Sequence, residues 1–177
     1  YLKDQTYIRS ATAEAERRKF EELLAFFQRF GDQYGFDPLM LAAQGYQESR
    51  LDQSMRSRAG AIGVMQVTKA TAKDKRVGVA GIEKVEPNIQ AGSKYMRVLL
   101  DQYFPDLRQD PFNATMFAFA AYNAGPTRLA RLRAAAPKAG LDPKVWFDNV
   151  ELLVADEVGR EPVEYVRNIF KYYVAYR

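Results

Sequence analysis

The segment FDPLMLAAQGYQESRLD, residues 36–52, combines a clear helix start with a single glutamate. Asp37 is a good N-cap and Pro38 suits the first turn, so the sequence predicts that a helix begins here. Glu48 falls near the end of this helix, one turn after Gln44. The surroundings of Glu48 are therefore the first clue to function.

No residue one helical turn away from Glu48 is a cation. Gln44 and Gly45 lie one turn before it. Leu51 lies one turn after it. If the helix continues, Asp52 also lies one turn after it and carries a like charge. Nothing local then lowers the pKa of the Glu48 carboxyl group, and partial burial would raise it. A carboxyl group that is protonated near neutral pH can serve as a general acid, and Gly45 would leave a gap for a flat ring. The alternative interpretation is a solvated glutamate near a helix end.

Apolar residues recur at helical spacing through most of the chain. Besides the helix at 36–49, the pattern predicts helices over 13–35, 86–104, 110–125, 126–137, 142–159 and 161–177. Thr68 is expected to cap a further short helix, and residues 54–63 are interpreted as a loop. Residues 74–86 are expected to be irregular or a short extended piece. Because no period-2 strand longer than about four residues is visible, the sequence predicts an all-α domain of about seven to nine helices.

Composition limits the chemistry that this chain can perform. Its 177 residues fit one domain, and they include neither cysteine nor histidine. Disulfides, thiol nucleophiles, histidine acid–base catalysis and Cys- or His-ligated zinc are therefore excluded. Acid–base work is left to Asp, Glu, Lys or Tyr. The net charge of +4 is ordinary solubility charge, although it would also suit a polyanionic partner.

The first residues, YLKDQTYIRS (1–10), include neither a starting Met nor the apolar centre of a signal peptide. No run of about 18 consecutive apolar residues is present, so no membrane span is expected. These features are consistent with a mature or excised piece of a longer protein.

Two other segments carry side chains suited to binding a ligand. The loop runs into GVMQV (63–67), where Gln66 offers both a hydrogen-bond donor and an acceptor. FAAYNAGP (119–126) places Tyr122 and Asn123 at a helix end, where a ring face and an amide can meet a sugar. The alternatives are an ordinary helix connection in the first case, and a core tyrosine with a C-cap asparagine in the second.

The late segment EPVEYVRNIFKYY (161–173) adds a further set of polar groups. Tyr165 and Ile169 share one helix face there, and Glu161 lies one turn before Tyr165. A tyrosine-rich core helix is the alternative interpretation.

Taken in this order, four motifs resemble the lytic transglycosylase family with the soluble-lytic-transglycosylase, or goose-lysozyme-like, catalytic domain. They are QESRLD (47–52), SRAGAIGVMQVTKATA (57–72), AYNAG (121–125) and EPVEYVRNI (161–169). The resemblance runs from about residue 36 to 173, and the combination of motifs is specific although no single motif is. The long N-terminal helix and the GREPVEYVRNIFKYY ending resemble the membrane-bound type F transglycosylases.

The resemblance implies a lysozyme-like helical domain with a glycan-binding groove, and an enzyme with no cofactor and no metal. Residues 1–177 would form one catalytic domain, with 1–35 as an N-terminal helical extension packed on it. The implied partner is the peptidoglycan glycan strand, not nucleic acid. A type F protein would be periplasmic and associated with the outer membrane. A solute-binding-like module would precede the catalytic one, and membrane association would come only from segments outside this chain.

Three of the matched positions lie in the first two motifs. Glu48 matches the family's single catalytic acid/base. Ser57 matches a serine that hydrogen-bonds at the catalytic acid and the substrate N-acetyl group, and Gln66 closes the Gly-x-Met-Gln motif that lines the glycan groove. Val64 stands where Leu is usual. Thr68 stands where some members have a Met that packs on the substrate, so no role is carried over to it.

The remaining matched positions concern the walls of the groove. Tyr122 and Asn123 match residues that face the sugar beside the acid. Glu161 and Tyr165 match the late Glu and Tyr of the groove wall.

The resemblance implies cleavage of the β-1,4 bond between N-acetylmuramic acid and N-acetylglucosamine without water, giving 1,6-anhydro ends. One glutamate serves as acid and then as base. Asp52 lies too close to Glu48 on the same helix end to face it across a sugar bond. A goose-type lysozyme that hydrolyses the same bond is the nearest alternative. A non-catalytic peptidoglycan-binding module is the second, and a nucleic-acid binder using Arg128, Arg131 and Arg133 is a distant third.

Overall fold

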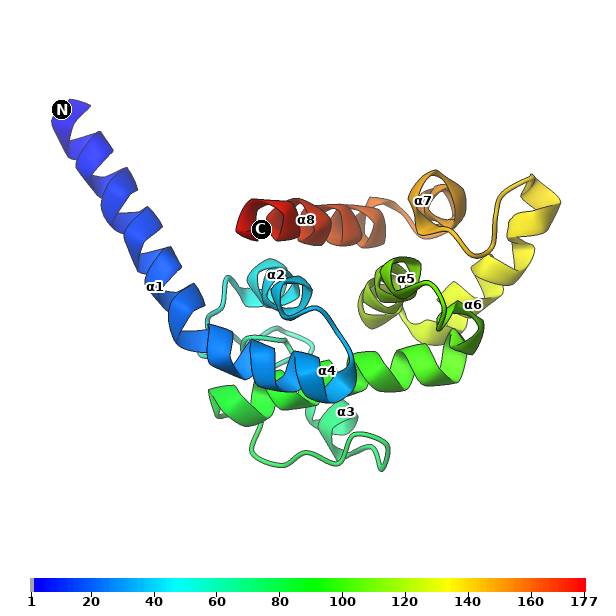
Figure 1. The fold of residues 1–177 in the computed structure, drawn as a ribbon, viewed down its shortest axis with the longest axis horizontal. Helices are drawn as coiled ribbons and strands as arrows, with labels where there is room; N and C mark the ends of the chain where they lie inside the picture. The colour runs from blue at the N-terminus through cyan, green and yellow to red at the C-terminus, as the bar shows by residue number, and fades with distance from the viewer. Residues whose placement is uncertain (1) are drawn as a thin grey trace.

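The structure is a computed structural model that describes residues 2–177, with side chains from Thr12 onward. The helices are α1 (Leu2–Tyr34), α2 (Pro38–Ser49), α3 (Lys69–Lys73), α4 (Val85–Tyr103), η1 (Pro105–Leu107), α5 (Pro111–Ala124), α6 (Pro126–Ala135), η2 (Ala136–Ala139), η3 (Trp146–Val150), α7 (Glu151–Glu157) and α8 (Arg160–Tyr176). Apart from two isolated bridges, which join Arg56 to Ile62 and Ile62 to Val67, these residues contain no β-structure. The all-α class is therefore confirmed (Figure 1). Within residues 2–177, no helix is both long and apolar enough to cross a membrane.

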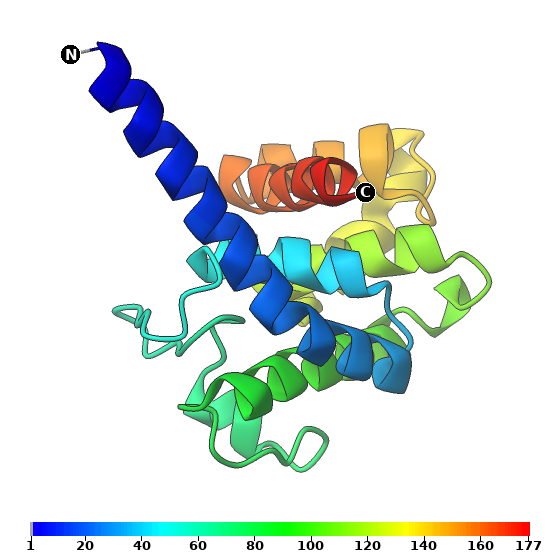
Figure 2. The same ribbon diagram turned by 60° about the vertical axis from the view of Figure 1, so that its left-hand side comes forward.

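α2 lies between α1 and α8. It packs against both α1 and α8, and its contact with α8 is the more extensive (Figures 1 and 2). Leu41, Ala42 and Ala43 are fully buried although consecutive side chains point in different directions around a helix. Burial on several sides explains why the first half of α2 is apolar all round, whereas its second half carries polar residues.

The prediction that Gly45 opens a gap for a sugar ring is wrong. Gly45 is buried, and a Cβ atom there would lie 3.0 Å from Val64 Cγ1 and 3.2 Å from Phe27 Cζ. The missing side chain lets α1 and the loop that contains Val64 approach α2 closely. Gly45 therefore serves the packing of the core.

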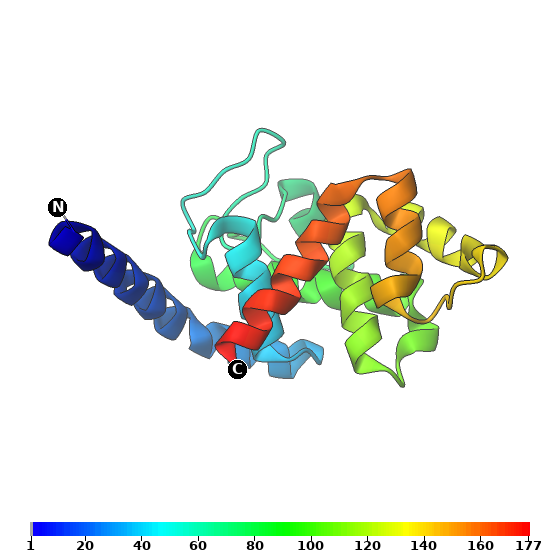
Figure 3. The same cartoon turned by 90° about the horizontal axis from the view of Figure 1, so that it is seen from above.

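Among its described side chains, α1 packs on the body of the molecule mainly through its second half, and Glu16 in its first half accepts a 3.4 Å hydrogen bond from the Tyr46 hydroxyl. Phe27 and Phe30 are buried, and this part of the helix contacts α2 and α4. Toward its N-terminus α1 extends away from the other helices (Figures 1 and 3). Of the expected extension over residues 1–35, the part before Thr12 lies outside the described side chains, and Tyr1 lies outside the description altogether.

α5 runs through the interior and brings its last turn to the surface. Residues 114–121 are all buried, and the helix contacts α4, α6 and α8. It ends at Gly125, whose φ of 97° breaks the helix before Pro126 starts α6. Tyr122 and Asn123, which lie in the last turn, are therefore partly exposed.

The helix starts expected at Asp37 and Thr68 are confirmed. An oxygen of the Asp37 carboxylate accepts a hydrogen bond from the backbone N–H of Leu39 at 2.9 Å. The Thr68 hydroxyl accepts one from the N–H of Thr71 at 3.2 Å. The irregular segment is also confirmed, since no regular element occurs between Asp74 and the start of α4.

The prediction of a single helix over residues 142–159 is wrong in its first half. One distorted turn, η3, precedes α7, and Asp148 within it has a positive φ of 58°. This kink accompanies the complete burial of Trp146, whose ring meets Phe117 edge-on with centroids 5.7 Å apart. Burial of the large indole ring outweighs the helical preference of the local sequence.

Candidate active site

A pocket of about 360 Å³ opens where the C-terminal end of α2 meets α5 and α8. Its lining is almost entirely polar and consists of Gln47, Glu48, Asn123, Glu161, Glu164, Tyr165 and Asn168. Four residues expected at a glycan site, namely Glu48, Asn123, Glu161 and Tyr165, therefore line one cavity. They come from three helices that are distant in the sequence and packed together in the fold (Figure 3).

The carboxyl group of Glu48 is held in a form that retains its proton. Burial raises the pKa of Glu48 from its ordinary value of 4.5 to about 7, and the nearby carboxylate of Glu161 also raises it. A hydrogen bond from the Tyr165 hydroxyl to Glu48 Oε1, 2.7 Å long, acts in the opposite direction. Among the described residues, the groups that act on this carboxyl group include no cation. Near neutral pH much of Glu48 is therefore protonated, as a general acid requires.

Tyr165 is buried on the inner face of α8, with 4% of its surface exposed. Burial, and to a lesser extent the neighbouring Glu48, hold the pKa of the Tyr165 hydroxyl well above its usual value. This hydroxyl thus keeps its proton at any physiological pH and remains a donor toward Glu48.

Tyr122 fastens the loop at residues 63–67 to α5. Its hydroxyl donates a 2.6 Å hydrogen bond to the carbonyl oxygen of Met65, and its ring packs against Tyr95 with centroids 5.4 Å apart. Burial and then the Glu48 carboxyl group hold the pKa of Tyr122 well above its usual value, so Tyr122 and Glu48 are close in space. The hydroxyl is occupied by the loop, which leaves the ring as the part that can meet a ligand.

Ser57 and Gln66 do not line the pocket that contains Glu48. Ser57 is exposed, and its hydroxyl accepts a hydrogen bond from the N–H of Ala61 at 3.0 Å. The amide of Gln66 donates to the carbonyl oxygens of Gly63 at 2.8 Å and Met55 at 3.2 Å. Both side chains form hydrogen bonds with the backbone of their own loop in this structure.

Asn88 on α4 is hydrogen-bonded to the backbone of the same loop. It was not among the residues predicted for the site. It is fully buried, its Oδ1 accepts from the N–H of Met65 at 2.9 Å, and its Nδ2 donates to the carbonyl oxygens of Ile62 at 2.7 Å and Ile82 at 2.9 Å. A signal was present in the sequence, because this asparagine lies beside Ile89 on the apolar part of its helix. A buried amide in that position must find backbone partners.

Asp52 lies outside the pocket. Hydrogen bonds from the hydroxyl and the N–H of Ser54 hold the pKa of the Asp52 carboxyl group below its usual range. The other carboxylates at the pocket are those of Glu161 and Glu164, which are exposed. No cluster of three or more acidic side chains in the described part of the chain is arranged to hold a metal ion.

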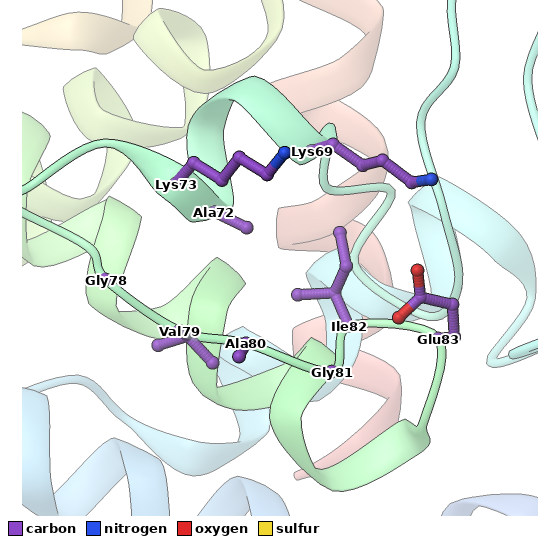
Figure 4. Close-up of a pocket in the computed structure, with 9 residues that line it drawn as sticks. All are labelled: Lys69, Ala72, Lys73, Gly78, Val79, Ala80, Gly81, Ile82 and Glu83. Carbon is purple, nitrogen blue, oxygen red and sulfur yellow. The ribbon is translucent and has the colours of Figure 1, made fainter.

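A slightly larger cavity, of about 400 Å³, lies between α3 and the segment at residues 78–83 (Figure 4). Lys69 and Lys73 border it on one side and Glu83 on another. All three side chains are exposed. Without a buried acid, this cavity offers nothing for acid catalysis.

Two kinds of relative resemble this chain over most of its length. Membrane-bound lytic murein transglycosylase F of Ectopseudomonas mendocina is 35% identical over 160 residues, which cover 83% of this chain and 32% of that protein. The protein of the same name from Desulfosudis oleivorans is 35% identical over 159 residues, covering 82% and 34%. The chain thus spans about a third of the length of the curated relatives it matches.

A solved structure with a similar fold is an inactive mutant of the lytic transglycosylase Slt from Pseudomonas aeruginosa, in which a glutamate is replaced by glutamine. It superposes with a TM-score of 0.62 and 26% sequence identity, over 86% of this chain and 23% of that one. This likeness agrees with the expected lysozyme-like helical fold.

The family model described as the transglycosylase SLT domain matches residues 25–142. The matched part includes Glu48 and Asn123, whereas Glu161 and Tyr165 lie beyond it. Because the match covers more than half of the residues, the chain belongs to the transglycosylase SLT domain family.

Proposed function

We propose that this chain is the catalytic domain of a peptidoglycan lytic transglycosylase. It would cleave the β-1,4 bond between N-acetylmuramic acid and N-acetylglucosamine without water and leave 1,6-anhydro ends. The observation that carries the proposal is Glu48, a carboxyl group with a pKa of about 7 in a polar pocket. The names of the relatives, and a solved relative made inactive by a glutamate-to-glutamine change, support the same assignment.

In the proposed reaction Glu48 acts twice. Its proton passes to the glycosidic oxygen, the bond from that oxygen to C1 of the muramic residue breaks, and the glucosamine end leaves as an alcohol. The muramic N-acetyl carbonyl, or the field of the site, stabilises the positive charge at C1. The Glu48 carboxylate then takes the proton of the muramic 6-hydroxyl, whose oxygen bonds to C1. An internal hydroxyl has a large effective-molarity advantage over water, and Glu48 ends the cycle protonated.

Glu161 is the second carboxylate that this mechanism must account for. It lines the same pocket and is exposed, so it lacks the desolvation that keeps Glu48 protonated. We assign Glu161 to the groove wall, where its negative charge helps Glu48 to keep its proton. On this assignment a single glutamate carries both proton transfers.

The remaining matched residues are proposed to bind the glycan. Asn123 and Tyr165 lie at the pocket beside the acid, and Tyr122 offers its ring nearby. Ser57 and Gln66 would contact more distant sugars along the groove, since they lie outside this pocket.

We propose one catalytic domain over residues 1–177, with residues 1–35 as a helical extension packed on it. The peptidoglycan strand is the proposed partner. By analogy with the type F relatives, we also propose a periplasmic location at the outer membrane. A solute-binding-like module and a membrane attachment would then lie in segments outside this chain.

The direct test is the variant Glu48→Gln, with the fold checked by circular dichroism. Release of anhydro-muropeptides from purified sacculi should fall by about 10²–10⁴-fold, because the proton donor is gone. Glycan binding should persist. The variant Asp52→Asn is the matched control, since Asp52 lies outside the pocket, and it should cleave like the wild type. Wild-type product release by Glu48→Gln would exclude Glu48 as the acid.

The hydrolase alternative is separated from the proposal by the mass of the products. A goose-type lysozyme would add water and give a product about 18 Da heavier than the 1,6-anhydro form. Mass spectrometry of the muropeptides therefore decides between the two reactions.

A non-catalytic peptidoglycan-binding module would retain binding and release no fragments, so the same digestion tests it. The nucleic-acid alternative is weakened by Arg133. This side chain is ion-paired with Asp106 and stacked over Phe104 and Phe117, so it supports the core of the domain.

A further inference from the structure

Gln44 is a fully buried polar side chain at the centre of the fold. It lies on α2 one turn before Glu48. Its Oε1 atom is buried and has no hydrogen-bond partner among the described residues. An unpaired buried amide oxygen costs stability, and an apolar side chain of similar size would avoid that cost. The position therefore has a reason for its amide other than stability.

The nitrogen of the Gln44 amide is linked to Glu48 through the hydroxyl of Tyr165. Gln44 Nε2 donates to the hydroxyl oxygen of Tyr165 at 3.1 Å and lies 3.6 Å from the sulfur of Met96. The Tyr165 hydroxyl in turn donates to Glu48 Oε1 at 2.7 Å. The three side chains thus form a short hydrogen-bonded chain in which every donor points toward Glu48.

This arrangement fixes the direction of one proton. A tyrosine hydroxyl has a single O–H and can both donate and accept. Because Gln44 has no acceptor on the nitrogen that faces Tyr165, the Tyr165 hydroxyl must accept from Gln44, and its own proton is left for Glu48. Donation to the hydroxyl oxygen also polarises the O–H bond and strengthens the second hydrogen bond.

We propose that Gln44 is a positioning residue that holds Tyr165 as a hydrogen-bond donor to Glu48. The catalytic part of this inference rests on the proposed function. There Glu48 is the acid in the first step and the base in the second, so it must be able to give up its proton. Through Tyr165, Gln44 stabilises the carboxylate form that follows the first step.

The neighbouring groups act in the opposite direction. Burial and the carboxylate of Glu161 favour the protonated form of Glu48, whereas Glu164 lines the same pocket and is not among the groups that shift the pKa of Glu48. The hydroxyl of Tyr122 is directed to the loop and not to the acid. Tyr165 is therefore the group on α5 and α8 that favours the ionised acid, and Gln44 supports it.

The test is a direct titration of Glu48 by carbon-13 NMR, with its signal assigned by its loss in Glu48→Gln. The variant Gln44→Met keeps the volume and removes the N–H donor. It should raise the pKa of Glu48 by about 0.3, while Tyr165→Phe, which removes the whole hydrogen bond, should raise it by about 1 or more. In the Tyr165→Phe background, Gln44→Met should add no further change.

The chain provides a matched control in Gln90, whose Nε2 donates to the hydroxyl of Tyr34 at 3.3 Å on α1. The variant Gln90→Met removes the same kind of hydrogen bond and should leave the pKa of Glu48 unchanged. Gln44→Met should also unfold at no lower temperature than the wild type, since it removes the unpaired oxygen. If Gln44→Met fails to fold, Gln44→Leu replaces it in the same comparison.

An unchanged pKa of Glu48 in the Gln44 variant, or an equal rise with and without the Tyr165 hydroxyl, would overturn the proposal. The titration needs no substrate, so its outcome is independent of the proposed activity. If the pKa values change as expected but no glycan is cleaved, the proposed function fails and the positioning role of Gln44 stands. If the wild type cleaves glycan, the alkaline limb of the pH–rate profile should lie at higher pH in Gln44→Met than in the wild type, by the same amount as the rise in the pKa of Glu48.

Discussion

The Tyr165 hydroxyl donates to Glu48 Oε1 across 2.7 Å, although 117 residues separate the two positions. This hydrogen bond favours the ionised carboxyl group, whereas burial and Glu161 favour the neutral one. The balance leaves the pKa of Glu48 at about 7, close to the pH at which a group that both gives and takes a proton works best.

The stability of the fold should depend on pH through Glu48. Its pKa is raised in the folded state, so its stabilising contribution is fully present below about pH 4.5 and is lost as pH rises to about 7. The loss amounts to at most about 3 kcal/mol. Urea unfolding at several pH values should show this slope in the wild type and its absence in Glu48→Gln. Equal slopes in the two proteins would mean that Glu48 is as solvated when folded as when unfolded.

The charge of Glu161 should help to set the proton affinity of Glu48. In Glu161→Gln, removal of a nearby negative charge should lower the pKa of Glu48 and move the alkaline limb of glycan cleavage to lower pH. Glu164→Gln is the matched control, because Glu164 borders the same pocket but is not among the groups that shift the pKa of Glu48. Complete loss of activity in Glu161→Gln, with an unshifted pKa of Glu48, would instead make Glu161 a second catalytic carboxylate.

Removal of Asn88 should loosen the loop beside the site. Asn88→Ala would leave the N–H of Met65 and the carbonyl oxygens of Ile62 and Ile82 without their partner. Each unpaired buried group costs about 1–3 kcal/mol, so the loss of stability should reach about 3 kcal/mol. Hydrogen exchange should accelerate first at the loop amides. If exchange is unchanged there, Tyr122 and the loop's own hydrogen bonds are sufficient to hold it.

Gly92 should not tolerate even a methyl group. A Cβ atom there would lie 2.6 Å from Cβ of Met65, which is too close for two carbon atoms. Gly92→Ala should therefore cost about 1–3 kcal/mol, visible as a lower unfolding temperature. The adjacent variant Ser93→Ala is the control, because the Ser93 hydroxyl is buried without a partner and its removal should cost little or nothing. Similar losses in both variants would indicate general sensitivity of α4.

The local signals of the sequence predicted most of the fold. Asp37 and Thr68 cap helices as their positions indicated, because side-chain capping depends on residues only two or three positions away. The sequence also predicted that no cation within one helical turn would lower the pKa of Glu48, but the burial that raises this pKa depends on tertiary contacts and was left open.

Predictions that depended on tertiary contacts were less successful. Gly45 looked like an opening and is a packing point against Phe27, which lies on another helix. The kink at Asp148 accompanies the burial of Trp146, and the periodicity of the local sequence did not predict it. The roles of Asn88 and Gln44 depend on partners far away in the sequence, so the one-dimensional pattern contained only the hint of a polar residue on an apolar helix.

The packing of α8 across α2 and α5 links the activity of the acid to the completion of folding (Figure 3). Tyr165 and Glu161 reach the acid only when the last helix has docked. Four of the seven residues that line the pocket lie on α8, so the pocket around Glu48 is incomplete without this helix. A chain whose last helix is undocked would hold Glu48 as an ordinary solvated carboxylate, ionised at neutral pH. A partly folded domain would thus lack the proton donor, since the acid becomes one only after the final helix is in place.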